Sequence, residues 1–184
     1  MYYVILLIVI VILLMLIVEV IFYNQFQMAK IRISEAQNNI DILLQKKFQL
    51  LERIKKIIEE ADSKYQEEPI LANLLKIKHK KINNFELNKE LETAWAEYKG
   101  YVDLDSSLAK LSTLKNIGFE LIEIDNDLKA SKKYYNDHII LYNNLVKRFP
   151  SNLVAKVFHY QKEPFFPEVK IETLEILKEQ KVIK

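Results

Sequence analysis

The sequence predicts an all-α protein in which an N-terminal transmembrane helix continues into an elongated antiparallel bundle. The bundle has three long helices and a short C-terminal helix, similar to a four-helix bundle. Only two glycines and four prolines occur among 184 residues, which disfavours a turn-rich β fold. The first 22 residues are almost wholly apolar, and later apolar residues recur every three or four positions, as on one face of a helix.

The composition argues against several classes of function. The chain has no cysteine, which excludes disulfides, thiolate metal sites and thiol catalysis. Its 27 Lys and Arg balance 25 Asp and Glu, so net charge does not indicate a nucleic-acid partner. The sequence has neither a glycine-rich phosphate loop nor a His-Glu-x-x-His zinc motif, and its three histidines lack metal-ligand spacing. We therefore expect surface histidines, no metal, no cofactor and no enzymatic activity.

Residues 1–23 are predicted to form a transmembrane anchor. No charged side chain precedes Glu19, and about 20 apolar residues make roughly 30 Å of helix, the thickness of a bilayer core. A cleaved signal peptide would carry a basic residue before the apolar run, and none is present. Aromatic side chains suited to the membrane interface stand near both ends of the span: Tyr2, Tyr3 and Tyr23.

Two basic residues, Lys30 and Arg32, follow the span, and none precedes it. The positive-inside rule therefore favours a single-pass protein of the cell membrane with a cytoplasmic C-terminal domain. Residues 24–167 are predicted to form the helical bundle. Residues 168–184 are predicted to form a loosely attached, charged C-terminal tail.

The first helix is predicted to run straight out of the membrane, because residues 24–62 contain no Gly or Pro. Its predicted seam, typical of a coiled coil or bundle helix, alternates steps of three and four residues. The seam comprises Phe26, Ala29, Ile33, Ala36, Ile40, Leu43, Lys47, Leu50, Ile54, Ile57 and Ala61. Lys47 is its one polar member. A break is expected after Ala61, where capping residues and Pro69 follow.

Two further long helices are predicted at about 69–99 and 104–148, with Gly100 as a C-terminal cap between them. The second of these carries a heptad row of Leu114, Leu121, Leu128, Tyr135, Tyr142 and Phe149. A Tyr-Asn pair occurs twice in this row, at Tyr135-Asn136 and Tyr142-Asn143. Because both tyrosines continue a leucine row, we expect core packing with a polar partner for each hydroxyl. The alternative is a binding surface.

Charged residues interrupt the predicted core. Asp125 and Lys132 lie two turns apart on a face of the third helix that should be buried, and Lys47 interrupts the first helix in the same way. Unpaired buried charge is costly, so these three are predicted to form a paired polar layer inside the bundle. A functional alternative is a proton-handling or ligand site, although the second carboxylate or histidine usual in acid/base pairs is missing.

The C-terminal part is predicted to turn at Pro150, where Ser151 can cap a short helix over residues 151–158. Two aromatic residues follow between prolines, Phe165 and Phe166, and indicate an extended segment that lies along the helices. We expect these rings to dock onto their own bundle. The alternative is an aromatic plug for a groove on a partner.

The chain resembles the LemA family of bacterial membrane-anchored helical proteins. The motif residues that carry the resemblance are Tyr23, Asn24, Asp41, Tyr135, Asn136, Tyr142, Asn143, Phe149 and Pro150. The resemblance implies an N-terminal anchor bearing a long antiparallel bundle with no established enzymatic activity. It also implies a membrane metalloprotease as a partner, because some members are encoded near such enzymes. Asp125 stands where the family usually has Glu, and Lys132 where it usually has Arg.

The sequence thus predicts a non-enzymatic membrane protein that presents its bundle as a scaffold or tether for protein partners. The alternative is a ligand- or pH-sensing auxiliary subunit of a membrane enzyme such as a metalloprotease, acting through Lys47, Asp125 and Lys132. The basic run at 76–81 is expected to be a solvated helix face, so we predict no nucleic-acid partner. The heptad seams leave open a homo-oligomer formed by pairing between copies.

Overall fold

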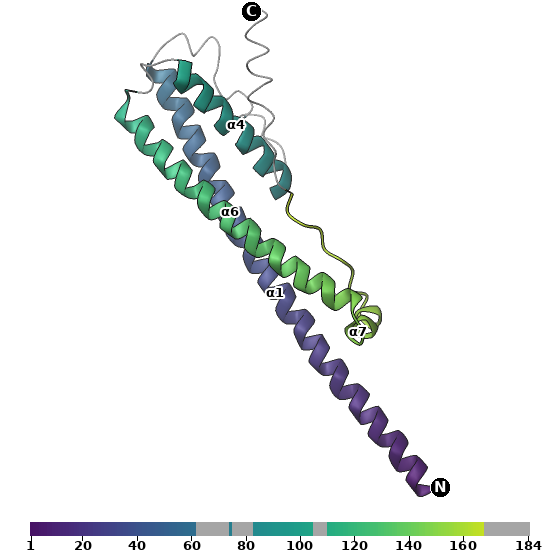
Figure 1. Cartoon of the computed structure of the whole chain (residues 1–184). Coiled ribbons are helices and arrows are strands. Elements are labelled where there is room, and N and C mark those ends of the chain that lie inside the picture. The colour runs from purple at the N-terminus through teal and green to yellow at the C-terminus, as the bar shows by residue number, and fades with distance from the viewer. Residues whose placement is uncertain (62–73, 75–82, 105–109, 168–184) are drawn as a thin grey trace, which may run out of the picture. The chain divides into compact units, whose positions relative to one another are not determined.

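The computed structural model describes residues 1–61, 74, 83–104 and 110–167 (Figure 1). Within these ranges it contains α1 (Tyr2–Ala61), α4 (Asn84–Leu104), α6 (Ser112–Lys147) and α7 (Ser151–Val157), and no strand. The predicted all-α fold with a long N-terminal helix is therefore confirmed. The basic run at 76–81 and the predicted tail at 168–184 lie outside the described residues.

The helix boundaries agree with the predictions in part. α1 is described through Ala61, and the break expected directly after it lies outside the described residues. The predicted start at Pro69 lies outside the described residues. The prediction that Gly100 caps a helix is wrong, because α4 continues through it to Leu104. A single interior glycine costs a helix only about 1 kcal/mol, which tertiary packing readily offsets. α6 begins at Ser112, later than the expected 104.

Contacts along the chain divide it into two compact units, which are described separately. Unit 1 comprises residues 1–38 and 132–166, and unit 2 comprises residues 39–131 and 167–184. α1 and α6 each contribute one part to unit 1 and another part to unit 2.

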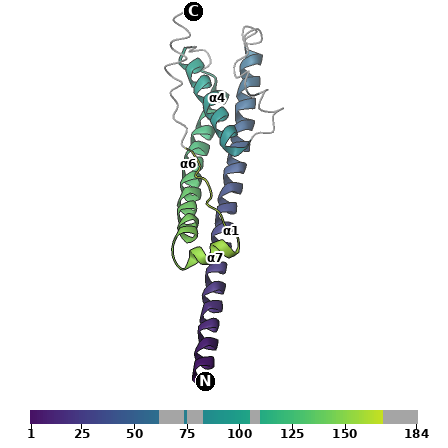
Figure 2. The ribbon, with the colours of Figure 1, turned by 90° about the vertical axis from the view of Figure 1, so that its right-hand side faces the viewer.

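Unit 1 pairs the first part of α1 with the last part of α6, and the short α7 follows the end of α6 and lies against α1, which continues past it toward the N-terminus (Figures 1 and 2). The residues after α7 form an extended return segment, residues 159–166, which runs back along α6. The apolar core of unit 1 is made by Phe26, Ala29, Ile33, Ala36, Tyr135, Ile139, Tyr142, Val154, Ala155 and Phe166.

Unit 2 packs the last part of α1 against α4 and the first part of α6. Its apolar core includes Ile40, Leu44, Leu51, Ile54, Ile58, Leu91, Ala94, Trp95, Ala96, Tyr98, Leu114, Ile117, Leu121 and Leu128. The tyrosine ring of Tyr98 stacks on Trp95 with centroids 5.3 Å apart. Burial of large apolar side chains from all three helices is the main force that holds this unit together.

The buried row of α1 departs from the predicted seam after Ile40. The structure buries Leu44, Leu51 and Ile58 in place of the predicted Leu43, Leu50 and Ile57. Ile40, Lys47 and Ile54 stay buried as predicted, so only the alternate row of the seam moves by one residue. Two consecutive steps of four, from Ala36 to Ile40 to Leu44, place the moved row on the buried face. The remaining steps then alternate as predicted.

The heptad row of α6 is confirmed from Leu114 through Tyr142, because each of its five members is at most 1% exposed. The prediction that Phe149 continues the row is wrong, since its side chain is 80% exposed. α6 ends at Lys147, so the next heptad position no longer lies on a helix.

The connections around α7 have defined hydrogen bonds. Pro150 is the N-cap of α7. The predicted capping role of Ser151 is wrong, since its single hydroxyl donor instead lies between two carbonyls near the end of α6, 2.7 Å from Leu145 O and 2.8 Å from Arg148 O. At the other end, the Tyr160 amide donates to Ala155 O and the His159 amide to Lys156 O, while His159 has φ 55°. This is a Schellman ending, which redirects the chain into the return segment.

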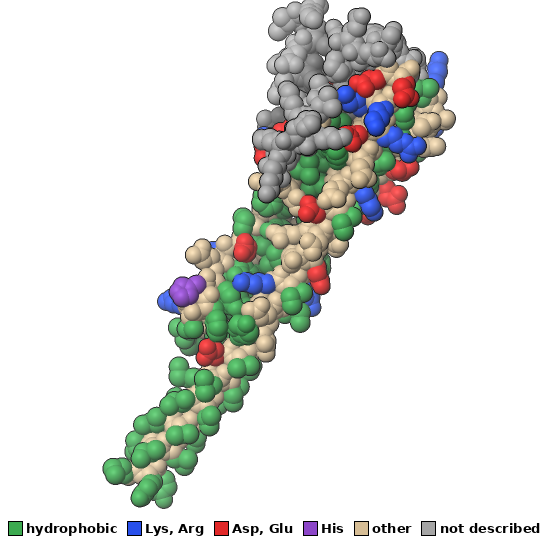
Figure 3. Space-filling view, turned by 180° about the vertical axis from the view of Figure 1, so that it is seen from behind, with side chains coloured by type: hydrophobic (Ala, Val, Ile, Leu, Met, Phe, Trp, Pro, Cys, Tyr) green, Lys and Arg blue, Asp and Glu red, His purple; other side chains and the backbone are tan. Residues whose placement is uncertain are grey.

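Among the described residues, one helix is long and apolar enough to cross a membrane, and it includes the N-terminal part of α1. Side chains there are exposed from Met1 through Val18. Figure 3 shows hydrophobic side chains covering the visible face of this segment. An exposed surface of this kind suits a lipid environment.

Candidate functional site

An ion cluster lies in unit 2 and joins its three helices. Lys47 Nζ on α1 donates to Asp125 Oδ1 on α6 at 2.6 Å and lies 3.1 Å from Glu92 Oε1 on α4. The lysine side chain is fully buried, whereas the two carboxylates are 18% and 17% exposed. Two carboxylates thus compensate one buried ammonium, which would otherwise be very unfavourable.

The predicted polar layer is therefore present in part. Lys47 and Asp125 are in contact, as predicted. Lys132 lies in unit 1, where its Nζ is 5.5 Å from the centroid of the Phe166 ring. Glu92 was not predicted, because it lies one position outside the apolar stripe that contains Leu91. An acidic residue beside that stripe, facing a helix with a buried lysine, was the available signal.

The Tyr-Asn repeat of unit 1 binds the return segment. Asn136 Nδ2 donates to Phe166 O at 3.2 Å, and Asn136 Oδ1 accepts from the Phe166 amide at 2.8 Å. Asn143 repeats the arrangement with Glu163, with both distances at 2.9 Å. Each asparagine therefore satisfies the donor and the acceptor of one backbone residue, as a neighbouring β-strand would.

The spacing of the repeat matches the rise of an extended chain. Asn136 and Asn143 are seven residues apart, about 10.5 Å along an α-helix. Their partners Glu163 and Phe166 are three residues apart, about 10 Å in an extended segment. One face of α6 therefore presents two amide side chains in register with every third residue of the return segment. The seven-residue repeat thus places the tyrosines in the core and the adjacent asparagines against the return segment.

The tyrosines of the repeat contribute packing and one hydrogen bond. Tyr135 OH donates to Pro164 O at 3.2 Å, and its ring meets Phe166 edge-on, with centroids 6.2 Å apart. Tyr142 packs edge-on against Phe26. Burial raises the pKa of both phenols above the usual 10.0, and the nearby Glu163 carboxylate raises it further.

The aromatic pair at the end of the return segment divides. Phe166 is 4% exposed and docked in unit 1, as expected, whereas Phe165 is 51% exposed. The segment is also fixed at its start, where Tyr160 packs against Phe26 with centroids 4.6 Å apart and accepts a hydrogen bond from Gln27. The return segment therefore occupies the surface that the Tyr-Asn repeat forms.

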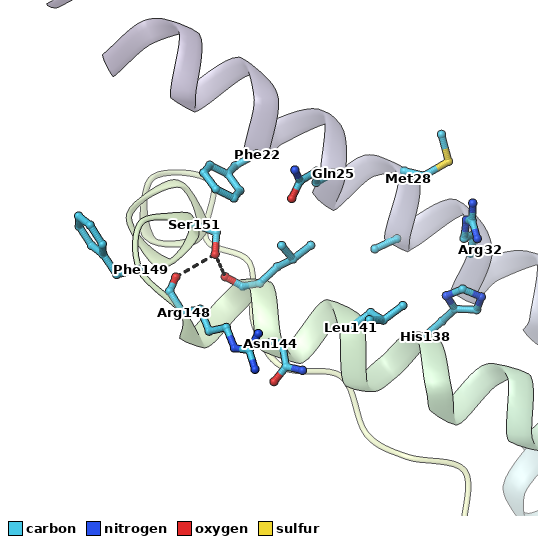
Figure 4. A pocket seen from close by; sticks show the side chains of 12 residues that line it. Phe22, Gln25, Met28, Arg32, His138, Leu141, Asn144, Arg148, Phe149 and Ser151 are labelled. Carbon is cyan, nitrogen blue, oxygen red and sulfur yellow. Dashed lines mark hydrogen bonds between the residues drawn. The ribbon is translucent and has the colours of Figure 1, made fainter. Parts of the chain in front are cut away.

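A cavity of about 480 Å³ opens at the base of unit 1 (Figure 4). Its lining combines apolar side chains with two arginines: Phe22, Gln25, Met28, Ala29, Arg32, His138, Leu141, Asn144, Leu145, Arg148, Phe149 and Ser151. The expectation of surface histidines is wrong for His138, which is 7% exposed and meets the Tyr134 ring edge-on. Guanidinium groups in an apolar surrounding suit phosphate or carboxylate groups.

A second cavity, of about 280 Å³, lies in unit 2 between α4 and α6. Its lining comprises Trp95, Tyr98, Lys99, Val102, Asp103, Lys115, Gly118, Phe119 and Ile122. Gly118 lies in the interior of α6, and a Cβ added there would meet no atom within 4 Å. The glycine thus leaves open space beside the Trp95 and Tyr98 rings. Sequence reasoning did not predict this cavity.

The remaining motif residues have varied surroundings. Tyr23 packs on Phe158 with centroids 5.0 Å apart, Asn24 is exposed, and Asp41 is partly buried on α1. Phe149 is exposed beside the N-cap Pro150. In the part of the chain that the structure describes, no group of three or more His, Cys, Asp or Glu side chains could hold a metal ion.

Comparison with known proteins gives a consistent result. The family model described as LemA family matches residues 36–176. This range contains the Tyr-Asn repeat, the return segment and the ion cluster. The comparison with curated proteins finds no match. Because the family match spans well over half of the 184 residues, the chain belongs to the LemA family.

Proposed function

We propose that this chain is a non-enzymatic, single-pass membrane protein that presents its helical region as a scaffold for a protein partner. The apolar, exposed start of α1 supports the anchor. Polar side chains of the two units are paired with groups of the same chain, which supports a structural role. Lys47 is fully buried between two carboxylates, and Asn136 and Asn143 are bound to the chain's own backbone.

The observation that carries the proposal is the open surface at the cavity of unit 2. Phe119 and Ile122 lie one turn apart on α6 and are 59% and 51% exposed. They border the space left by Gly118, next to the Trp95 and Tyr98 rings. Exposed apolar side chains around an aromatic-lined hollow are typical of protein interaction sites. Membrane metalloproteases are the first partners to test, given the family resemblance.

The sensor alternative receives less support from the ion cluster. The Lys47 ammonium has no exposed surface with which to bind a ligand. The two carboxylates are 18% and 17% exposed, but both already contact the lysine. The cluster therefore suits a fixed connection between three helices better than a switch.

The test compares two substitutions at one position. Gly118→Ala adds a Cβ into open space and should stabilise the helix by about 0.5–1 kcal/mol while leaving the cavity open. Gly118→Leu should fill the cavity. A photo-reactive residue replacing Phe119 in the full chain then reports partner capture in native membranes.

We expect the same captured protein in the unsubstituted and Gly118→Ala backgrounds and its loss in Gly118→Leu, at equal helicity. A photo-reactive residue replacing Ile42, which is 52% exposed on α1, is the matched control and should not capture it. Equal capture with Gly118→Leu and Gly118→Ala, or from Phe119 and Ile42 positions, would count against this surface.

A further inference from the structure

Unit 1 carries an exposed apolar surface around α7. Four side chains make up this apolar collar: Phe149 (80% exposed), Leu153 (47%), Val157 (63%) and Phe158 (39%). They are close in sequence and lie where α6 ends and α7 lies against α1, which continues past it (Figure 2). Exposed apolar residues scattered singly need no explanation, but a contiguous group indicates a partner.

The collar continues the surface of the N-terminal helix. A cavity of about 380 Å³ lies between them, lined by Val11, Leu14, Met15, Val18 and Glu19 of α1 and by Phe149, Pro150, Leu153, Val154 and Val157. Nearly all of this lining is apolar. α7 therefore lies beside residues that belong to the apolar span itself, and not beyond its end.

The position along α1 sets the depth of the collar. Val11 lies 11 residues before Phe22, the last residue of the apolar run, which is about 16 Å of helix. A bilayer core is about 30 Å thick. If the apolar run fills that core, the α1 residues that border the collar extend from about 4 Å inside the core at Glu19 to about its midplane at Val11. The collar then lies in the half of the core next to the helical region, and its outer edge is close to the headgroups.

Basic side chains accompany the collar. Residues 147–166 include four exposed Lys or Arg side chains, Lys147, Arg148, Lys156 and Lys162, and a single acidic one, Glu163. Arg148 also lines the neighbouring cavity with Arg32 (Figure 4). Glu19 also borders the collar. Figure 3 shows an acidic side chain at the hydrophobic end of α1 and Lys and Arg side chains just beyond it. The basic side chains complement anionic lipid headgroups.

We propose that the apolar collar inserts into the lipid interface, with its four hydrophobic side chains among the acyl chains and the adjacent basic side chains at anionic headgroups. The occupant of this surface is thus the same bilayer that surrounds the N-terminal span. This inference rests on the proposed membrane anchor and adds a second, independent contact with the membrane. The collar would hold unit 1 against the membrane surface.

The test uses the natural absence of cysteine. Three single variants of the full chain, Val157→Cys, Ile31→Cys and Leu13→Cys, are labelled with an environment-sensitive fluorophore. Each is placed in nanodiscs whose lipids carry a spin-label quencher near the headgroup or deep in the acyl chain. Ile31 is the matched control, because it is β-branched, 53% exposed and about 13 Å further along α1 than Phe22.

We expect the label at position 157 to be quenched by both lipid quenchers, because Val157 borders the same cavity as Val11 and Val18. The label at 13 should be quenched most by the deep quencher, and the label at 31 by neither. Quenching at 157 should rise when phosphatidylglycerol is added to phosphatidylcholine discs. Quenching at 157 no greater than at 31, with 13 still quenched, would overturn the collar and leave the anchor intact. No quenching at 13 would overturn the anchor and the collar together.

Two further outcomes also decide the matter. A label at 157 that neither the lipid quenchers nor an aqueous quencher reaches would show that protein covers this surface. That outcome would overturn the insertion of the collar into lipid. Equal quenching at 157 in neutral and anionic discs would overturn the role assigned to the basic side chains. Circular dichroism of each variant checks that the helices are intact.

Discussion

Lys47 is the residue on which the order of unit 2 depends most. Its buried ammonium contacts one carboxylate from α4 and one from α6. Loss of both partners would leave a charge with no compensation in an apolar surrounding, which costs several kcal/mol. Loss of the lysine would leave two carboxylates that still reach water, because each is partly exposed.

The double variant Asp125→Asn/Glu92→Gln should therefore lose about 3–5 kcal/mol of unfolding free energy. Adding Lys47→Met should recover most of that loss, because the methionine fills similar volume without a charge. Urea unfolding of the full chain in detergent micelles, followed by circular dichroism, measures both values. A triple variant no more stable than the double variant would show that the loss is not due to the uncompensated ammonium.

The tyrosines predict how stability depends on pH. The fold raises the pKa of Tyr135 and Tyr142 above 10.0, chiefly through burial, so it stabilises the neutral phenol. This contribution is fully present below pH about 10 and is lost as the pH rises through the raised folded-state pKa. Unfolding free energy should thus fall at alkaline pH, and Tyr142→Phe should reduce that fall. An identical alkaline profile for the variant would contradict the assignment.

The members of the ion cluster could be predicted from the sequence only where they interrupt an apolar row. Lys47 and Asp125 interrupt apolar rows, so their contact could be predicted, whereas Glu92 lies on an unmarked polar position. Lys132 follows the same row as Asp125, yet a row does not specify which neighbour a long flexible side chain contacts. The structure places its ammonium over the Phe166 ring.

At the scale of elements, α6 and the return segment fit because seven residues of a helix and three residues of an extended chain span nearly the same distance, about 10 Å. Asn136 and Asn143 each bind the backbone N–H and C=O of one residue, Phe166 and Glu163 respectively. The backbone N–H groups of Glu163 and Phe166 each donate to one asparagine side chain. Their protection from hydrogen exchange therefore depends on that single asparagine. Each hydrogen bond contributes about 1 kcal/mol net.

Asn143→Ala should increase hydrogen exchange at the Glu163 amide much more than at Phe166, and Asn136→Ala should do the reverse. Each change should cost about 1–2 kcal/mol, because two hydrogen bonds are lost. Asn144→Ala is the matched control, since Asn144 lines the basal cavity of unit 1 instead. Amide exchange measured by NMR or mass spectrometry distinguishes the three. Equal exchange at Glu163 in Asn143→Ala and Asn144→Ala would contradict the assigned contacts.

The buried face of each helix could be predicted where the spacing of apolar residues matches the residues that are buried. The row of α6 repeats every seven residues and was predicted correctly through Tyr142. One of the two rows of the α1 seam shifted by one position after Ile40, because neighbouring apolar residues such as Leu43 and Leu44 fit either position. The return segment was expected to be extended. Its pairing with Asn136 and Asn143 depends on equal distances along α6 and along the segment, and the sequence pattern of neither element shows this.

At the scale of the whole molecule, one continuous helix links the apolar start of α1 to the helical region. The apolar run and the basic residues after it predict a span with the following residues in the cytoplasm. Composition alone indicated this organisation, because a long run without charge has few other stable surroundings. The cavity beside Gly118, which we propose as the partner surface, arises from the packing of two helices and had no such signal in the sequence.

The most direct test of the account is the sidedness of the span in cells. Tyr3→Cys and Ile31→Cys, made separately in the cysteine-free chain, are treated with a membrane-impermeant maleimide before and after lysis. A span with a cytoplasmic helical region predicts that position 3 is labelled in intact cells and position 31 only after lysis. Equal labelling of the two positions in intact cells would contradict a membrane span between them, and the reverse pattern would contradict a cytoplasmic helical region.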